Sequence, residues 1–185
     1  VGPGNDYVTE AKRQLFGIVD IDMVAGPSEV VVVANDHSPP AFVMSDLSSQ
    51  AEHAKGLPIL VTTSKRLARS AKKSDVRGYI VLVRNRQEAI EVVNEIAPEH
   101  VEILVNKPNK WLSQIRHAGA IFLGPYSPVA VGDYYAGPSH VLPTGGTARF
   151  FSGLSVSDFV KSSSVISFSL KALEKAVLPI EEISK

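Results

Sequence analysis

The stretch Val30-Val31-Val32-Val33 decides the fold. An unbroken run of β-branched apolar residues is typical of a strand buried on both faces, as in the middle of a parallel sheet. Turn-forming residues stand on either side of it, Ala25-Gly26-Pro27-Ser28 before the run and Pro39-Pro40 after it. The run therefore predicts a central strand of an α/β sheet.

Strands and helices alternate along the chain after this run. The apolar pattern predicts further strands over 59–62, 80–83, 101–105 and 120–123, and helices over 41–55, 64–73, 86–96 and 109–117. Such alternation is typical of a parallel sheet with helices on both faces. We expect an α/β protein with a Rossmann-like, mostly parallel sheet, flanking helices and a C-terminal extension.

The first residues of the chain predict two short elements. Asn5 or Asp6 is expected to cap a helix that ends near Gly17, and a short strand is expected over 18–22. The chain begins with Val1 rather than Met, so we expect it to be part of a longer protein.

One long segment late in the chain interrupts the alternation. Residues 124–153 are rich in Gly, Pro, Ser and Tyr. A connection this long without structure of its own is more often functional than not. After it we expect a strand-like segment over 162–169 and a closing helix over 170–177.

Composition and charge exclude several kinds of partner. Of 185 residues, 44% are hydrophobic and 21% are charged, which is typical of a globular protein. The 19 Lys and Arg balance the 19 Asp and Glu, so bulk charge gives no reason to expect nucleic acid or an anionic membrane as partner. No apolar run approaches the ~18 to 20 residues of a membrane-spanning helix, and we expect no membrane partner.

The sequence contains no cysteine. This excludes disulfides and thiolate metal sites, so a metal would be held by His, Asp, Glu or an amide oxygen. It also fits a reducing compartment, and we expect a cytoplasmic protein.

The helix expected over 41–55 carries two candidate ligands. Gln50 and His53 are three residues apart, so they rise from one face and can converge on one ion or substrate. A solvated helix face is the commoner outcome of such a pattern, and from spacing alone both interpretations stay open. The candidate buried positions of this helix are Phe42, Leu47 and Ala51.

The segment Ala97-Pro98-Glu99-His100 places an acid beside an imidazole, between an expected helix and an expected strand. Pro98 prevents the helix from continuing and directs the two side chains that follow. An imidazole suits a general base near neutral pH, and an adjacent carboxylate can activate water. From spacing alone, a helix-exit turn with two exposed polar groups is the favoured interpretation.

Three further loop features could carry chemistry. Asp133 follows a glycine and can approach a metal or an ammonium group closely, although an Asx turn explains it equally well. His140 lies in the same loop, where a histidine bonded to backbone is the alternative. Gly2-Pro3-Gly4-Asn5 before a helix suits a phosphate-binding turn, but it is also common structural punctuation. This turn is the only feature that supports the alternative interpretation of a generic nucleotide-binding domain.

Six segments, taken together and in this order, strongly resemble histidinol dehydrogenase. They are Gly-Pro-Gly-Asn (2–5), Ile-Asp-Met-Val-Ala-Gly-Pro-Ser-Glu (21–29), Asp-Leu-Ser-Ser-Gln-Ala-Glu-His (46–53), Ala-Pro-Glu-His (97–100), Ala-Gly-Ala-Ile-Phe-Leu-Gly (118–124) and Gly-Asp-Tyr-Tyr-Ala-Gly-Pro-Ser-His-Val-Leu-Pro-Thr (132–144). The resemblance covers nearly the whole chain, from Gly2 to about Lys161.

The resemblance implies a zinc-dependent, NAD-linked enzyme of histidine biosynthesis. Such an enzyme oxidises L-histidinol through L-histidinaldehyde to L-histidine. The resemblance implies that Gln50, His53 and Asp133 are zinc ligands. It also implies that His100 accepts the alcohol proton and that Glu99 activates the water that hydrates the aldehyde.

Further roles follow from the same resemblance. Asn5 would belong to the cofactor site. The substrate would be bound by Ser28, Gln50, His53, His100, Asp133 and His140. Residues 1–29 would be the remnant of a cofactor-side domain, 30–150 a Rossmann-like domain with the zinc and substrate motifs, and 151–185 a C-terminal extension.

The resemblance also implies a homodimer with shared active sites, in which the partner subunit supplies a Glu and a His. Enzymes of this family are more than twice as long as this chain, so we expect a fragment with an incomplete site. Three protein ligands, one of them an amide oxygen, predict weak zinc binding. The alternative is a catalytically inactive truncated paralogue that acts as a ligand- or zinc-binding interaction module.

Overall fold

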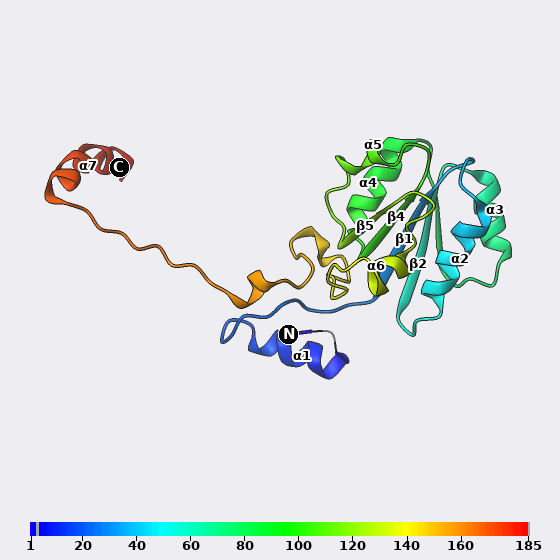
Figure 1. Ribbon diagram of the computed structural model, residues 1–185, viewed down its shortest axis with the longest axis horizontal. Coiled ribbons are helices and arrows are strands. Elements are labelled where there is room, and N and C mark those ends of the chain that lie inside the picture. The colour runs from blue at the N-terminus through cyan, green and yellow to red at the C-terminus, as the bar shows by residue number, and fades with distance from the viewer. Residues whose placement is uncertain (3, 185) are drawn as a thin grey trace. The chain divides into compact units, whose positions relative to one another are not determined.

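The valine run lies in β1 (Ser28–Ala34), the middle strand of a five-stranded sheet (Figure 1). The structure, a computed structural model, describes residues 1–2 and 4–184. Neighbouring strands pair in parallel, in the order β3-β2-β1-β4-β5. The other strands are β2 (Gly56–Thr62), β3 (Tyr79–Leu82), β4 (His100–Leu104) and β5 (Ala120–Leu123). The expected Rossmann-like α/β class is confirmed.

A helix follows each of the first four strands. These helices are α2 (Pro40–Ala51), α3 (Lys65–Lys73), α4 (Arg86–Ile96) and α5 (Asn109–Leu112). Pro40 suits the first turn of α2 because its fixed φ is already helical. The Ser64 hydroxyl and the Asn85 side chain accept backbone N–H groups at the starts of α3 and α4.

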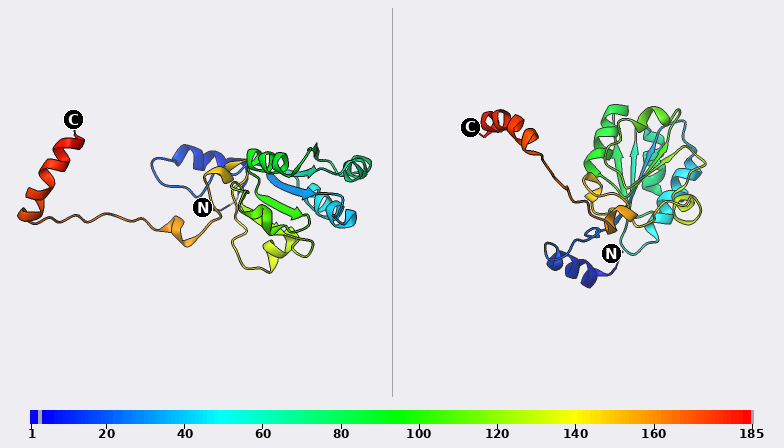
Figure 2. Two further views of the ribbon diagram at one scale, coloured as in Figure 1. Left: turned by 90° about the horizontal axis from the view of Figure 1, so that it is seen from above. Right: turned by 60° about the vertical axis from the view of Figure 1, so that its left-hand side comes forward.

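The two faces of the sheet are covered by different helices (Figures 1 and 2). Because side chains alternate along a strand, Val31 and Val33 point to one face of β1 while Val30 and Val32 point to the other. The first face packs on α4 and α5 through Ala89, Ile90, Val93, Trp111 and Ile115. The second face packs on α2 and α3 through Val43, Leu47, Leu67 and Ala71. The valine run is therefore buried from both sides, as the sequence predicts.

Two expected strands do not form. Residues 18–22 make only an isolated bridge between Phe16 and Val19, and Ile18 is 79% exposed. Residues 162–169 are in no strand, and Val165 is 95% exposed. Neither segment pairs with a neighbouring strand among the described residues, and a strand needs such a partner to satisfy its backbone.

Other boundaries also differ from the sequence-based expectation. The segment 124–153 is not structureless, since it contains α6 (Val129–Tyr134) and a 3₁₀ turn (Thr147–Arg149). The helix expected over 109–117 ends at Leu112. Phe42 is 43% exposed rather than buried, whereas Leu47 is buried as expected.

The chain divides into two units, Val1–Ser155 and Val156–Lys185. The first holds α1 (Asp6–Leu15), the sheet and its helices. The second holds a 3₁₀ turn (Val156–Phe159) and α7 (Leu170–Ile183), which continues past Pro179 and so is longer than expected. Within residues 1–2 and 4–184, no helix combines the length and apolar character that crossing a membrane requires.

Candidate functional site

The candidate residues gather at the edge of the sheet where β1 and β4 begin. Ser28 is the first residue of β1 and His100 is the first residue of β4. The two strands are neighbours, with Val30 in register with His100. Ligands of open α/β sheets usually bind beyond the carboxyl ends of the strands. This group of polar residues lies at the opposite, amino-terminal edge.

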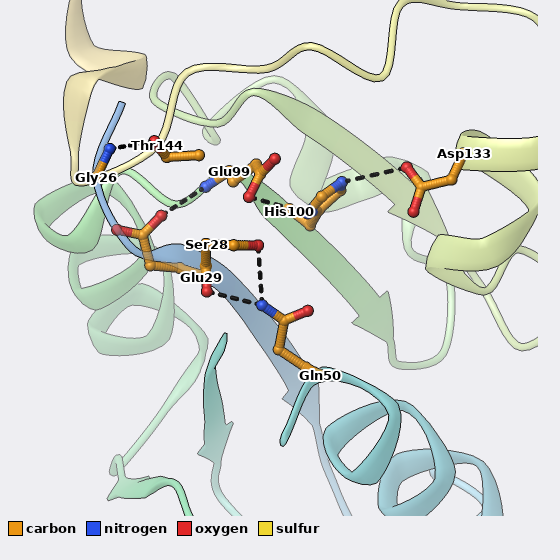
Figure 3. A network of polar contacts seen from close by, with 8 residues as sticks. All are labelled: Gly26, Ser28, Glu29, Gln50, Glu99, His100, Asp133 and Thr144. Carbon is orange, nitrogen blue, oxygen red and sulfur yellow. Dashed lines mark hydrogen bonds and ion pairs between the residues drawn. The ribbon is translucent and has the colours of Figure 1, made fainter. Parts of the chain in front are cut away.

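Helix α2 brings Gln50 to this edge because it runs back across the sheet after β1 (Figure 3). The Gln50 amide nitrogen donates to the Ser28 carbonyl at 2.7 Å and to the Ser28 hydroxyl at 2.9 Å. Gln50 is buried, so the expectation of a solvated helix face is wrong for this residue. Both bonds use the amide nitrogen, which leaves the amide oxygen free to bind a ligand.

The turn between α4 and β4 directs Glu99 and His100 inward. Ala97 adopts a left-handed conformation with φ of 51°, and Pro98 follows it. Glu99 is 8% exposed and His100 is 5% exposed. The favoured interpretation of two exposed polar groups is therefore wrong. Spacing could not predict their burial because Glu99 contacts residues that lie elsewhere in the sequence, Glu29 of β1 and Ala120 of β5.

Three side-chain polar atoms of this pair lack hydrogen-bond partners among the described residues. Within residues 1–2 and 4–184, buried Glu99 Oε2 and both ring nitrogens of His100 make no hydrogen bond. His100 Nδ1 lies 3.8 Å from Glu99 Oε2, and His100 Nε2 lies 3.8 Å from Asp133 Oδ1 (Figure 3). These distances are too long for hydrogen bonds. Buried polar atoms left without partners are expected where a ligand binds.

Burial shifts the protonation of both groups toward neutral forms. Burial raises the pKa of Glu99 to about 7; a hydrogen bond from Ser28 opposes this, and the charges of Glu29 and Asp133 add to it. Burial lowers the pKa of His100, which Asp133 opposes. Near pH 7 the structure therefore holds a neutral imidazole beside a carboxyl group poised to exchange a proton.

Helix α6 supplies Asp133 from the long glycine-rich segment. Gly132 lies so close to Phe122 that an added Cβ would be 2.6 Å from the Phe122 ring. The Phe122 ring in turn lies against the His100 imidazole, with 5.8 Å between ring centroids. Gly132 therefore allows the close packing that brings Asp133 next to His100.

These residues line one cavity of about 540 Å³. Its walls include Ser28, Gln50, His53, Glu99, His100, Asp133 and His140. The structure thus brings together every residue predicted to bind substrate or zinc or to act in catalysis. Asn5 does not line this cavity, since its side chain accepts the Val8 N–H at the start of α1. Pro3, in the proposed phosphate-binding turn, lies outside the described residues.

Two acidic residues near the site were not identified from the sequence, Asp46 in the cavity wall and Glu102 next to Asp46. Glu102 is 1% exposed, and burial together with the neighbouring charge of Asp46 raises its pKa to about 9. Asp46 lines the cavity and lies one helical turn before Gln50. The signal was present, because Glu102 interrupts an apolar strand two residues after His100 and so must face the same side.

The donor set suits zinc chemically, since Gln50, His53 and Asp133 offer amide oxygen, imidazole nitrogen and carboxylate oxygen. The described residues nevertheless contain no group of three or more His, Asp or Glu side chains gathered closely enough to hold a metal ion. Zinc would therefore depend on the Gln50 oxygen and on donors from the substrate or from another chain.

Comparison with known proteins gives one family throughout. A sequence profile of the family described as histidinol dehydrogenase matches residues 1–76 and 68–185. Histidinol dehydrogenase from Listeria monocytogenes is 50% identical over 194 residues, covering 95% of this chain and 45% of the relative. The Halalkalibacterium halodurans protein of the same name is 53% identical over 191 residues, covering 93% of this chain and 45% of the relative.

A solved structure agrees with the sequence comparison. The crystal structure of histidinol dehydrogenase from Elizabethkingia anophelis superposes with a TM-score of 0.87 at 34% identity, covering 99% of this chain and 47% of that one. The chain spans about half the length of the curated relatives it matches.

Proposed function

The chain belongs to the histidinol dehydrogenase family, and on this premise we propose that its cavity is part of an active site that oxidises L-histidinol to L-histidine. One observation carries the proposal: all seven residues predicted to bind substrate, hold zinc or act in catalysis line the same cavity. L-histidinol is a small cation at neutral pH, and carboxylates of Asp46, Glu99 and Asp133 line this cavity.

When bound, zinc would position the imidazole and amine of histidinol, and NAD would accept the hydride in each of two oxidations. Gln50, His53 and Asp133 are the residues that would hold zinc. Asn5 would contact the cofactor from the start of α1. Ser28, at the start of β1, and His140, in the segment after α6, would contact the substrate.

In the first oxidation, His100 accepts the proton of the substrate hydroxyl. Burial keeps the imidazole neutral, so a ring nitrogen has a lone pair for that proton. Neither ring nitrogen makes a hydrogen bond with another described residue. Asp133, 3.8 Å from Nε2, stabilises the imidazolium that forms.

In the second oxidation, Glu99 removes a proton from the water that adds to the aldehyde. A carboxyl group with a pKa of about 7 is partly ionised at neutral pH, which suits it to accept and return a proton. As the water adds, the imidazolium of His100 returns its proton to the carbonyl oxygen, which becomes a hydroxyl of the hydrate. That hydroxyl gives its proton back to the neutral His100 imidazole as the second hydride leaves. Each turnover consumes one water and two molecules of NAD.

Binding can be tested on this chain without turnover. Zinc and L-histidinol are titrated into the chain, and the imidazole proton signals of His53 and His100 are followed by NMR. We expect histidinol to shift the His100 signals only when zinc is present. His53→Ala should weaken zinc binding at least about tenfold, while Glu52→Ala, an exposed neighbour, serves as the control. Equal zinc affinity in parent and His53→Ala would overturn the metal assignment.

The catalytic roles are tested by a turnover assay on an enzyme of full family length that contains this segment. The family resemblance predicts that this enzyme is a cytoplasmic homodimer. Glu99→Gln and His100→Gln should each abolish histidinol-dependent NADH formation, measured by absorbance. Histidinol binding should persist in Glu99→Gln, because Gln keeps the shape of the side chain. Near-parental turnover in both variants would remove these residues from the mechanism.

A second candidate function is a zinc- or ligand-binding interaction module without activity. It is supported by the cavity itself, whose lining residues all belong to this chain. Histidinol binding by this chain, with no NADH formed when the rest of the family's length is supplied in trans, would support this alternative.

A further inference from the structure

Glu29 is a buried acid that the proposed chemistry does not use. It follows Ser28 at the start of β1 and is 5% exposed, yet it is not among the residues that line the cavity. Carboxyl groups are almost never this deeply buried unless they are paired or hydrogen-bonded. Its partners therefore indicate what it does.

The backbone N–H groups that face Glu29 come from two turns, and Figure 3 shows the one that belongs to Glu99. Glu29 Oε2 accepts the N–H of Glu99 at 3.4 Å, and the backbone N–H groups of Gly145 and Gly146 act to lower the pKa of the Glu29 carboxyl group. Both glycines adopt left-handed conformations, with φ of 65° and 76°, which side-chain-bearing residues rarely take. Glu29 thus joins the Glu99 turn to the glycine turn of the long segment.

The glycine turn is also tied to the chain just before β1. Thr144 Oγ1 accepts the N–H of Gly26 at 2.7 Å (Figure 3), and the N–H of Gly145 donates to the Pro27 carbonyl at 3.2 Å. A Cβ on Gly26 would lie 2.9 Å from Gly145 Cα, so the two backbones touch. Glu29 is therefore at the centre of a fixed junction and not on a free loop.

Glu99 is held on its other side by β5. The Glu99 carbonyl accepts the N–H of Ala120 at 2.8 Å. A Cβ on Gly119 would lie 2.6 Å from the same oxygen. The backbone of Glu99 is thus held at its N–H by Glu29 and at its carbonyl by β5, which fixes the point from which the side chain enters the cavity.

We propose that Glu29 is a positioning residue, which holds the backbone of Glu99 and the Thr144–Gly146 turn together and so fixes the place and the charge environment of the Glu99 carboxyl group. The importance of this role for catalysis rests on the proposed function of Glu99. The geometric role can be tested independently of it.

The charge of Glu29 has its own effect on Glu99. The groups that face Glu99 are Ser28 and Glu29 from β1, Asp133 from α6 and His100 beside it. Ser28 stabilises the ionised form, whereas Glu29 and Asp133 oppose it. Removing the charge of Glu29 should therefore lower the pKa of Glu99, an effect that a purely structural role would not predict.

The experiment compares the parent chain with Glu29→Gln and Glu29→Asp. Gln removes the charge at constant size, while Asp keeps the charge and withdraws it by one methylene. The ionisation of Glu99 is followed by carbon-13 NMR of its labelled carboxyl group. The amide exchange of Glu99, Gly145 and Gly146 is followed in the same samples.

In Glu29→Gln we expect the pKa of Glu99 to fall by about half a unit or more and the three amides to exchange about tenfold faster. In Glu29→Asp the amides should exchange faster while the pKa of Glu99 stays closer to the parent. The control, Glu91→Gln, removes an exposed charge on α4 and should change neither.

The positioning role of Glu29 and the proposed function of Glu99 can be refuted independently of each other. Unchanged Glu99 ionisation and unchanged amide exchange in Glu29→Gln would overturn the positioning role, whatever the activity. Should Glu29→Gln fail to fold, the same comparison is made with Glu29→Asp, where unchanged exchange is the contrary result. Changed ionisation and exchange, with turnover that survives Glu99→Gln, would uphold the positioning role and refute the proposed function of Glu99.

Discussion

Replacing Glu102 by Gln should stabilise the chain, and increasingly so as pH rises. Glu102 is 1% exposed and faces α2, where the neighbouring carboxyl group of Asp46 approaches it. Burial and this neighbour raise the pKa of Glu102 to about 9, from an ordinary value of 4.5. At neutral pH the folded protein therefore keeps a proton that the unfolded chain releases.

The size of the effect follows from proton linkage. Between pH 4.5 and about 9, the folded state binds one more proton than the unfolded state, so the free energy of unfolding falls by about 1.4 kcal/mol per pH unit. The contribution of Glu102 to the free energy of unfolding is therefore about 3 kcal/mol lower at pH 7 than at pH 4.5. Below pH 4.5 both states are protonated and the difference vanishes. Gln carries no such proton and still donates a hydrogen bond to Asp46.

Urea unfolding of parent and Glu102→Gln at several pH values measures this difference. Trp111 is the only tryptophan and is buried against the sheet, so its fluorescence reports unfolding. From about pH 5.5 to about pH 7.5, the stability advantage of the variant should grow by roughly 2 to 3 kcal/mol. The exposed variant Glu91→Gln controls for general charge effects. An advantage that does not change with pH would show that Glu102 is ionised in the folded protein.

Three further substitutions test packing and local structure. Gly132→Ala places a Cβ 2.6 Å from the Phe122 ring, so α6 must move and carry Asp133 with it; we expect at least about tenfold weaker zinc binding in a competition assay with a chelator. Ser64→Ala removes the cap of α3 and should lower the free energy of unfolding by about 1 kcal/mol in urea. Leu60→Ala empties a fully buried position of β2 and should lower it by about 2 to 5 kcal/mol.

The sheet could be predicted because its signal is local. Residues 30–33 are apolar at both odd and even positions, and only a strand covered on both faces needs that pattern. The failed strand over 18–22 shows the limit of such reasoning. Its β-branched residues Ile18, Val19 and Ile21 favour a strand, but pairing depends on a neighbour that the local sequence does not specify.

The site could be predicted only in part, because the burial of a side chain depends on residues that are distant from it in the sequence. Spacing favoured exposure for Glu99, which is instead buried by contacts with residues from β1 and β5. Gln50 is buried and bonded to Ser28, whereas His53 lies two residues past the end of α2 and is exposed. Helical spacing predicted one shared face, but the helix expected over 41–55 ends at Ala51, so α2 places Gln50 and not His53.

The carboxyl groups around the cavity couple their own protonation to the binding of a cation. The chain has no net charge, yet three acids line one cavity, Asp46, Glu99 and Asp133. Two buried acids lie next to them, Glu29 beside Glu99 and Glu102 beside Asp46. Like charges this close oppose one another's ionisation, and burial adds to the effect, so Glu99 and Glu102 retain protons near neutral pH. A cation bound among them would relieve the same repulsion and favour release of those protons. The protonation of Glu99, on which its proposed chemistry depends, is therefore coupled to whatever cation occupies the cavity.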